Sequence, residues 1–192
     1  MKEYDDARAP EYDDWYYGRG QFTGRERPGW DNELASLERA LRSLAPARTL
    51  DVACGTGFLT RWLPGEIVGI DQSERMLAEA RKHVPHADLA RGDVLDGLPF
   101  ADDSFDRIFT GHFYGHLEPQ ARVRFLEEGR RVAPELVVVD SAGSGEEVQE
   151  RILRDGTRWE VYKRWFEPED LLDELGGGRT LHDGTYFVAV AS

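Results

Sequence analysis

Apolar residues recur along the chain in two patterns, and the first is typical of helices. Leucines stand three or four positions apart between Asp31 and Leu44, so one face of a helix there can be buried. Ser73 is a good N-cap for a second helix, which Pro85 ends. The same reasoning predicts further helices over 57–63, 119–132 and 168–175.

The second pattern consists of short apolar runs with the length of strands. They lie at 48–53, 66–70, 87–90, 105–110 and 136–139. The last run is continuously apolar, as expected of a strand buried on both faces of a parallel sheet. Because these strands alternate with helices, the pattern predicts an α/β fold with a doubly wound sheet.

The C-terminal part departs from this alternation. Residues 159–166 alternate apolar and polar side chains like a strand. Asp183 and Gly184 separate two strand-like runs within 180–190, which is a strong signal for a β-hairpin. We therefore expect the sheet to end in an antiparallel pair.

The first 22 residues are acidic and aromatic, and they have no clean period. Aromatic side chains at this density rarely stay in water, because each can bury roughly 150–250 Å². Two interpretations are open: a terminal arm packed on the domain, or a lid that closes over a ligand.

A glycine-containing turn after the first strand is the central feature of the sequence. It reads Cys54-Gly-Thr-Gly57. Glycine lets a ligand approach the backbone closely, because no Cβ intervenes and positive φ costs little. The unpaired N–H groups of such a turn favour a polar or anionic ligand group. Asp71 ends the second strand, and a carboxylate there together with the glycine turn is typical of nucleotide-binding proteins.

Two residues narrow the choice of nucleotide. A dinucleotide fingerprint has a third small residue where this chain has Thr60. Asp51, just before the turn, would sit poorly beside a pyrophosphate but could accept hydrogen bonds from an amino group. A mononucleoside that carries an amino-acid tail therefore fits better than a dinucleotide.

Four segments in order resemble the class I S-adenosylmethionine-dependent methyltransferases, of the small-molecule group called type 11. They are 50–57, 69–71, 92–94 and 105–108. The resemblance implies a Rossmann-like, doubly wound seven-stranded sheet, mostly parallel with a C-terminal antiparallel hairpin, and S-adenosylmethionine as the cofactor. It divides the single domain 1–192 into a helical arm or lid (1–45), a cofactor-binding core (46–140) and a pocket insertion with the hairpin (141–192).

The resemblance also implies roles for individual residues. Asp51 and the 53–57 turn would face the methionine moiety, Asp71 would accept both ribose hydroxyls, and Asp93 would take the adenine amino group. An aspartate at a strand end can also be only a turn former. The expected cofactor contacts are Asp51, Ala53, Cys54, Gly55, Gly57, Asp71, Gln72, Met76, Asp93, Val94, Thr110 and Gly111.

His112 and His116 are the candidate catalytic residues. Methyl transfer from a sulfonium is a direct displacement, so the protein mainly aligns the reactants and excludes water. A base is needed only if the acceptor is protonated at the working pH. A structural hydrogen bond is the alternative for His112, and support of the loop is the alternative for His116. No metal is expected, because H-E-x-x-H is absent and Gly115 interrupts the helix between the two histidines.

The loop after the fourth strand favours a small-molecule acceptor. It lacks the Asn/Asp-Pro-Pro-aromatic run of DNA and glutamine amino-methyltransferases. Aromatic residues are expected to form the walls of the acceptor pocket, although core packing is the alternative for each. They are Tyr12, Trp15, Tyr16, Phe113, Tyr114 and Trp165, with Trp159 and Tyr162.

The composition bounds the partners and the setting. A formal charge of -13 disfavours a nucleic-acid partner, whose phosphates would be repelled. The single cysteine excludes an intramolecular disulfide. No apolar run approaches the roughly 20 residues of a membrane span, and no leader opens the chain, so we expect a cytoplasmic protein.

Two other functions stay open at this point. An NAD(P)-dependent oxidoreductase would share only the glycine turn and Asp71 with this chain. A non-catalytic module that binds S-adenosylmethionine would keep the same 50–57 turn. The sequence does not predict the acceptor, the methylated atom or the oligomeric state.

Overall fold

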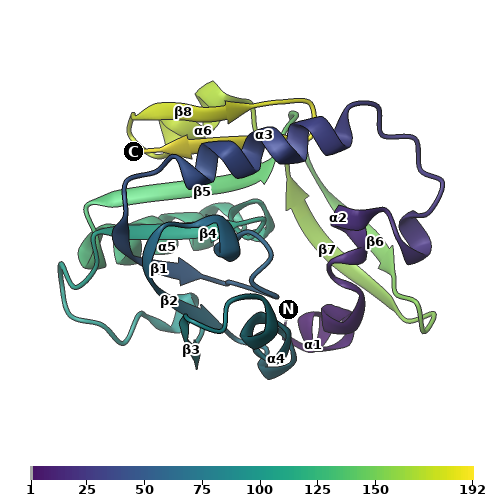
Figure 1. Cartoon of the computed structure of the whole chain (residues 1–192), viewed down its shortest axis with the longest axis horizontal. Coiled ribbons are helices and arrows are strands. Elements are labelled where there is room, and N and C mark those ends of the chain that lie inside the picture. Colours follow the sequence, from purple (N-terminus) through teal and green to yellow (C-terminus); the bar gives the residue numbers. More distant parts are fainter. Residues whose placement is uncertain (1) are drawn as a thin grey trace.

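Seven strands form the central sheet of the computed structural model, which describes residues 2–192 (Figure 1). Their order is β3-β2-β1-β4-β5-β9-β8. The parallel strands are β1 (Ala47–Val52), β2 (Gly65–Asp71), β3 (Asp88–Arg91), β4 (Arg107–Gly111) and β5 (Glu135–Ser141). The strands β8 (Arg179–Asp183) and β9 (Phe187–Ala191) form the antiparallel end. The predicted doubly wound sheet with its final hairpin is therefore confirmed.

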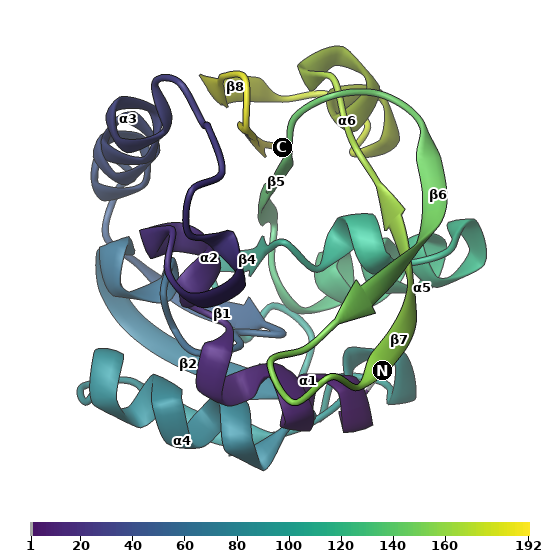
Figure 2. The ribbon, with the colours of Figure 1, turned by 90° about the vertical axis from the view of Figure 1, so that its right-hand side faces the viewer.

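Helices cover both faces of this sheet, as Figure 2 shows in a view toward one edge. The helices α3 (Trp30–Arg42) and α4 (Glu74–His83) lie on one face, and α5 (Pro119–Val132) and α6 (Pro168–Glu174) lie on the other. The backbone N–H of Met76 donates to the side chain of Ser73, so the predicted N-cap is confirmed.

The continuous apolar run of β5 follows from its place between the two layers. Leu136 and Val138 pack in the cluster that includes residues of α5 and α6. Val137 and Val139 pack in the opposite cluster, which includes residues of α3. All four side chains are buried, so both faces of this strand are apolar and the sequence shows no alternation of polar and apolar residues.

The helix predicted over 57–63 is wrong. Only a single 3₁₀ turn, η3 (Thr60–Trp62), forms there. Gly57 has a φ of 76°, so a right-handed helix cannot start before it. Leu63 is extended because it precedes Pro64, which disfavours the helical region for that residue. Too few residues are left between these two limits for an α-helix.

A second, two-stranded sheet and the N-terminal arm lie side by side at the carboxyl ends of the parallel strands (Figure 2). The sheet pairs β6 (Glu146–Ile152) with β7 (Arg158–Arg164), which confirms the strand expected near 159–166. Tyr4 of the arm packs in one cluster with Leu153 and Val161. The arm consists of α1 (Lys2–Arg8), η1 (Ala9–Glu11), α2 (Asp14–Tyr17) and η2 (Gly20–Phe22).

Two 3₁₀ turns complete the structure. They are η4 (Val94–Asp96), which follows β3, and η5 (Tyr114–His116), which follows β4. Within residues 2–192, no helix combines the length and the apolar character needed to cross a bilayer.

Candidate active site

Four loops meet where the parallel strands end, and they enclose a cavity of about 70 Å³. They follow β1, β2, β3 and β4, the edge at which open α/β sheets usually bind ligands. Eight of the predicted cofactor contacts line this cavity: Ala53, Gly55, Asp71, Gln72, Met76, Asp93, Val94 and Gly111. The fold thus brings together residues from four separate segments of the sequence.

Asp71 is held in one orientation by the backbone around it. Its Oδ2 accepts a hydrogen bond from the N–H of Gly55 at 2.9 Å, and its Oδ1 accepts one from the N–H of Ser73 at 2.8 Å. Burial raises the pKa of this carboxyl, and the two hydrogen bonds oppose the rise. Each oxygen has a further lone pair, so Asp71 can still accept hydroxyl groups from the cavity.

Asp51 is buried beside the glycine turn with one oxygen unpaired. Its Oδ2 accepts from the hydroxyl of Thr60 at 2.6 Å, whereas Oδ1 has no partner among the described residues. Burial raises the pKa of Asp51 to about 8, and the charge of Asp71 adds to the rise. A second cavity of about 20 Å³ adjoins Asp51 and the turn. A buried carboxyl in this state suits an amino group as a partner.

Thr60 is a site residue that the sequence indicated only as a departure from a pattern. Its hydroxyl orients Asp51, which explains why a third small residue is not used at that position. Cys54 lines the same small cavity, and burial raises the pKa of its thiol well above the ordinary value. The thiol therefore stays protonated and is no nucleophile.

Gly57 and Thr110, two further predicted cofactor contacts, line neither of these cavities. A Cβ on Gly57 would lie 3.1 Å from Val84 and 3.4 Å from Ala80, so this glycine lets α4 pack against the turn. Thr110 is fully buried, and its hydroxyl donates to the carbonyl of Val52 at 2.8 Å. In the structure both residues shape the turn and the strand ends that carry the contacts.

The N-terminal arm forms the opposite wall of the 70 Å³ cavity. Gln72 Nε2 donates to Asp5 at 2.8 Å, and the hydroxyl of Ser73 donates to Asp6 at 2.6 Å. Burial, followed by the charge of Asp71, raises the pKa of Asp5 to about 7. Aromatic residues of this arm were predicted to line a pocket, but its acids were not. The alternation of these acids with tyrosines was the only feature of the sequence that could have indicated their place in the site.

A larger cavity of about 590 Å³ lies between the arm and the β6–β7 hairpin. This volume is typical of small-molecule sites, which span roughly 300–1,000 Å³. The two cavities share five lining residues, which mark their junction: Tyr4, Arg8, Tyr12, His112 and His116. A ligand in one cavity would therefore meet a ligand in the other beside these side chains.

The predicted aromatic wall is only partly assembled around the larger cavity. Tyr12, Trp15 and Trp165 line it, and Phe113 lines the smaller cavity of Asp71. Tyr16 lines only the 20 Å³ cavity and stacks on Phe58 with ring centroids 3.6 Å apart.

Three other predicted wall residues lie outside all of these cavities. Tyr114 is fully buried in the core, and its hydroxyl donates to Glu174 at 2.8 Å. Trp159 packs on Tyr4, with ring centroids 5.9 Å apart. The hydroxyl of Tyr162 donates to Glu146 at 2.6 Å. Aromatic side chains are buried both in the core and in pocket walls, so the sequence alone could not distinguish a core position from a wall position.

His112 stands at the junction in a left-handed backbone conformation, with a φ of 56°. Its backbone N–H donates to the carbonyl of Val139 at 2.8 Å, and the ring Nε2 has no partner among residues 2–192. Burial lowers the pKa of the ring to about 4, against the opposing charge of Asp140, whose Oδ1 is 3.9 Å from Nδ1. Asp140 is itself paired with the buried Lys163. The imidazole is therefore neutral near pH 7.

His116 is also neutral, and its tautomer follows from its contact. Its Nδ1 lies 2.7 Å from the carbonyl oxygen of Tyr162. A carbonyl only accepts, so Nδ1 carries the proton and Nε2 is left as an acceptor. Burial lowers the pKa of this ring well below its ordinary value. No group of three or more side chains suited to a metal ion occurs in the described part of the chain.

Comparison with known proteins gives one family model and several relatives. Residues 49–135 match the model of a methyltransferase domain. A dTDP-3-amino-3,6-dideoxy-alpha-D-glucopyranose N,N-dimethyltransferase from Streptomyces fradiae is 36% identical over 71% of this chain and 53% of its own length. A demethylmenaquinone methyltransferase from Thermotoga maritima is 38% identical over 54% of this chain and 44% of its own. The chain spans between 30% and 59% of the length of the curated relatives that it matches first.

Two solved structures resemble the whole chain. One is described as a DhpI–SAM–HEP complex; it has a TM-score of 0.80 at 24% identity and covers 99% of this chain and 94% of its own. The other is described as a DhpI–SAH complex; it has a TM-score of 0.77 at 25% identity and covers 98% and 92%. The N-terminal arm and the β6–β7 hairpin thus belong to the fold that this chain shares with these two structures.

Proposed function

The chain belongs to the class I S-adenosylmethionine-dependent methyltransferases, and we propose that it transfers the methyl group of this cofactor to a small-molecule acceptor. The observation that carries the proposal is the pair of cavities with one junction. The smaller cavity has the carboxylates for a nucleoside with an amino-acid tail, and the larger one has the volume for an acceptor.

The side chains of the 70 Å³ cavity, and of the 20 Å³ cavity beside the glycine turn, fit the cofactor by their chemistry. The unpaired Oδ1 of Asp51 suits the ammonium group of the methionine moiety, and Asp71 suits the ribose hydroxyls. Asp93 also lines the 70 Å³ cavity, and we propose that it accepts a hydrogen bond from the adenine amino group. When bound, the cofactor supplies an electrophilic methyl group on a sulfonium.

The protein's own contribution is positioning and exclusion of water. The arm covers the smaller cavity through the bonds of Asp5 and Asp6, and we propose that it opens and closes as a lid. His112 at the junction is neutral and is a weak base, since its pKa is about 4. We propose that it orients the acceptor, or takes a proton from an acceptor whose own proton is already acidic.

A small-molecule acceptor is supported by the volume of the larger cavity and by the names of relatives that act on a nucleotide-linked sugar or a quinone precursor. The chain's charge of -13 argues against a nucleic-acid acceptor. We also propose a cytoplasmic setting, because the only cysteine is buried and unpaired.

Calorimetry with S-adenosylhomocysteine tests the cofactor site. We expect micromolar binding to the wild type and a loss of roughly tenfold to hundredfold in Asp71→Asn, because charge-assisted hydrogen bonds contribute about 1.5–3 kcal/mol each. The exposed Asp88 makes no side-chain contact among the described residues, so Asp88→Asn is the matched control. No binding to the wild type would refute the proposal. Binding without transfer of a labelled methyl to any small molecule of a cell extract would identify a non-catalytic module instead.

A further inference from the structure

Two arginines from distant parts of the chain meet at one hydroxyl group in the acceptor cavity. Arg8 ends α1, and Arg151 lies in β6. Their guanidinium Nη1 atoms donate to the hydroxyl of Tyr4 at 2.8 Å and 3.3 Å. Both side chains line the 590 Å³ cavity, and Arg8 also lines its junction with the smaller one.

Neither arginine forms an ion pair within the described part of the chain, although the charge of Asp5 contributes to the raised pKa of Arg8. Among residues 2–192, no carboxylate oxygen lies within the 4.0 Å of an ion pair from either guanidinium. Neighbouring arginines on the same hairpin differ, because Arg154 pairs with Glu11 and Asp14, and Arg158 pairs with Glu150. Two positive charges on one neutral oxygen repel each other, and an anion between them would remove the repulsion.

Their positive charge extends to the junction. Arg8 and Arg151 both contribute to the lowering of the pKa of His112, after burial and alongside Lys163. Arg151 also contributes to the lowering of the pKa of His116, after burial and Lys163. Both arginines therefore place positive charge near His112, where the two cavities meet, and the negative charge of Asp140 opposes them.

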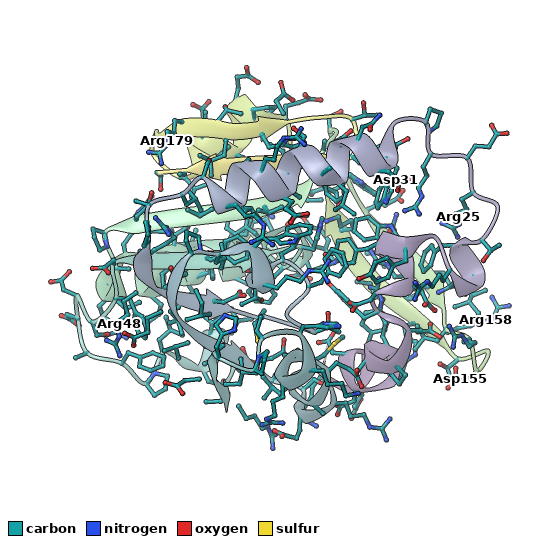
Figure 3. The ribbon with its side chains drawn as sticks, in the orientation of Figure 1. Arg25, Asp31, Arg48, Asp155, Arg158 and Arg179 are labelled. Carbon is teal, nitrogen blue, oxygen red and sulfur yellow. The ribbon has the colours of Figure 1, made fainter. Side chains whose placement is uncertain are left out.

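The other charged groups around the cavity leave this site available. Lys163 is neutralised by its ion pair with Asp140. Glu147 and Glu150 also line the cavity, but both are exposed and point to partners on the hairpin. Arg25 lines the outer part of the cavity, at the end of the molecule where the hairpin carries Arg158 (Figure 3).

We propose that Arg8 and Arg151 bind an oxyanion of the methyl acceptor, so that the acceptor is a small molecule with a carboxylate or a phosphate or phosphonate group. That the bound anion is the methyl acceptor rests on the proposed methyl transfer, whereas the anion site itself does not. Arginine suits both groups, because its planar fork donates two parallel hydrogen bonds to a pair of oxygens.

The test is calorimetry of three probes of similar shape, phenylphosphonate, benzoate and the neutral benzamide, with and without saturating S-adenosylhomocysteine. We expect one or both anions to bind and benzamide not to bind, and the two anions separate the two oxyanion classes. Arg151→Gln and Arg8→Gln should each lower the affinity for the anion tenfold or more, because each removes a charge-assisted hydrogen bond. Arg151→Lys should retain part of the affinity, and Arg158→Gln should leave it unchanged.

Several outcomes would overturn the inference, and they differ from failure of the cofactor site. Equal binding of benzamide and the anions, or unchanged anion affinity in Arg151→Gln, would refute the oxyanion site. A loss of S-adenosylhomocysteine affinity in Arg8→Gln, with no effect of Arg151→Gln on the anions, would assign Arg8 to the cofactor carboxylate instead. Anion binding without any binding of S-adenosylhomocysteine would keep the oxyanion site and refute the proposed methyl transfer.

Discussion

Replacement of Asp51 by asparagine should shift the stability of the cofactor-free protein in favour of the variant as the pH rises. Asp51 is almost completely buried, and one of its oxygens has no partner among the described residues. Its pKa is raised from 3.8 to about 8, chiefly by burial. The folded protein therefore holds a proton there that the unfolded chain releases at much lower pH.

The sign and size of the effect follow from proton linkage. A carboxyl with a raised folded pKa contributes its full stability below pH 3.8 and loses it as the pH rises to about 8. Each pH unit in this window removes about 1.4 kcal/mol, so a change from about pH 5 to about pH 7.5 removes about 3 kcal/mol at most. Asparagine does not titrate, and its unpaired amide adds a constant cost of about 1–3 kcal/mol.

The measurement is urea unfolding of wild type and Asp51→Asn at these two pH values, without cofactor. The difference in unfolding free energy should move in favour of the variant by up to about 3 kcal/mol, or roughly 6–12 °C in Tm for a chain of this length. Other acids with raised pKa values, such as Asp5, are present in both proteins and cancel in the difference. Asp88→Asn should show no such trend. A difference that is the same at both pH values would refute the reasoning.

Two further predictions concern the junction and the arm. The pKa of His112 is about 4, so the pH profile of kcat should show no inflection from this residue between about pH 5 and 9. His112→Ala should lower kcat about tenfold to hundredfold and leave the affinity for S-adenosylhomocysteine unchanged. An unchanged kcat would show that His112 has only a structural role. Asp6→Ala removes the bond to Ser73 and should speed tryptic cleavage at exposed Arg19 about twofold to tenfold, while Glu26→Ala should not. Equal cleavage rates would contradict a lid held by Asp6.

The central sheet could be predicted because its determinants are local. The leucines of α3, the N-cap at Ser73 and the Asp183-Gly184 turn each act within a few residues, and the structure confirms all three elements. The position of Asp71 beside the glycine turn follows from the parallel order of β1 and β2.

The acceptor cavity could not be predicted in the same way. The strand β6 reads EEVQERI, and it is stabilised by pairing with β7 rather than by an apolar face of its own. The meeting of Arg8 and Arg151 depends on how this hairpin packs against the arm, at a separation of 143 residues in the chain. Tyr114 was assigned to a pocket because aromatic character does not distinguish a core from a cavity wall, whereas the structure buries it on Glu174.

The two cavities offer a ligand different groups, carboxyls in the smaller cavity and guanidinium groups in the larger one, and the proposed anionic acceptor rests on this difference. Burial raises the pKa of Asp5 to about 7 and that of Asp51 to about 8, and a cationic group bound beside them would favour their ionised forms. Arg8 and Arg151 favour an anion in the larger cavity. Salt screens charges over about 8 Å at physiological ionic strength, so the distant surface acids that make the chain -13 count for little inside the cavity. At contact distance, the two guanidinium groups would favour an oxyanion over a neutral or cationic acceptor, as the proposed oxyanion site requires.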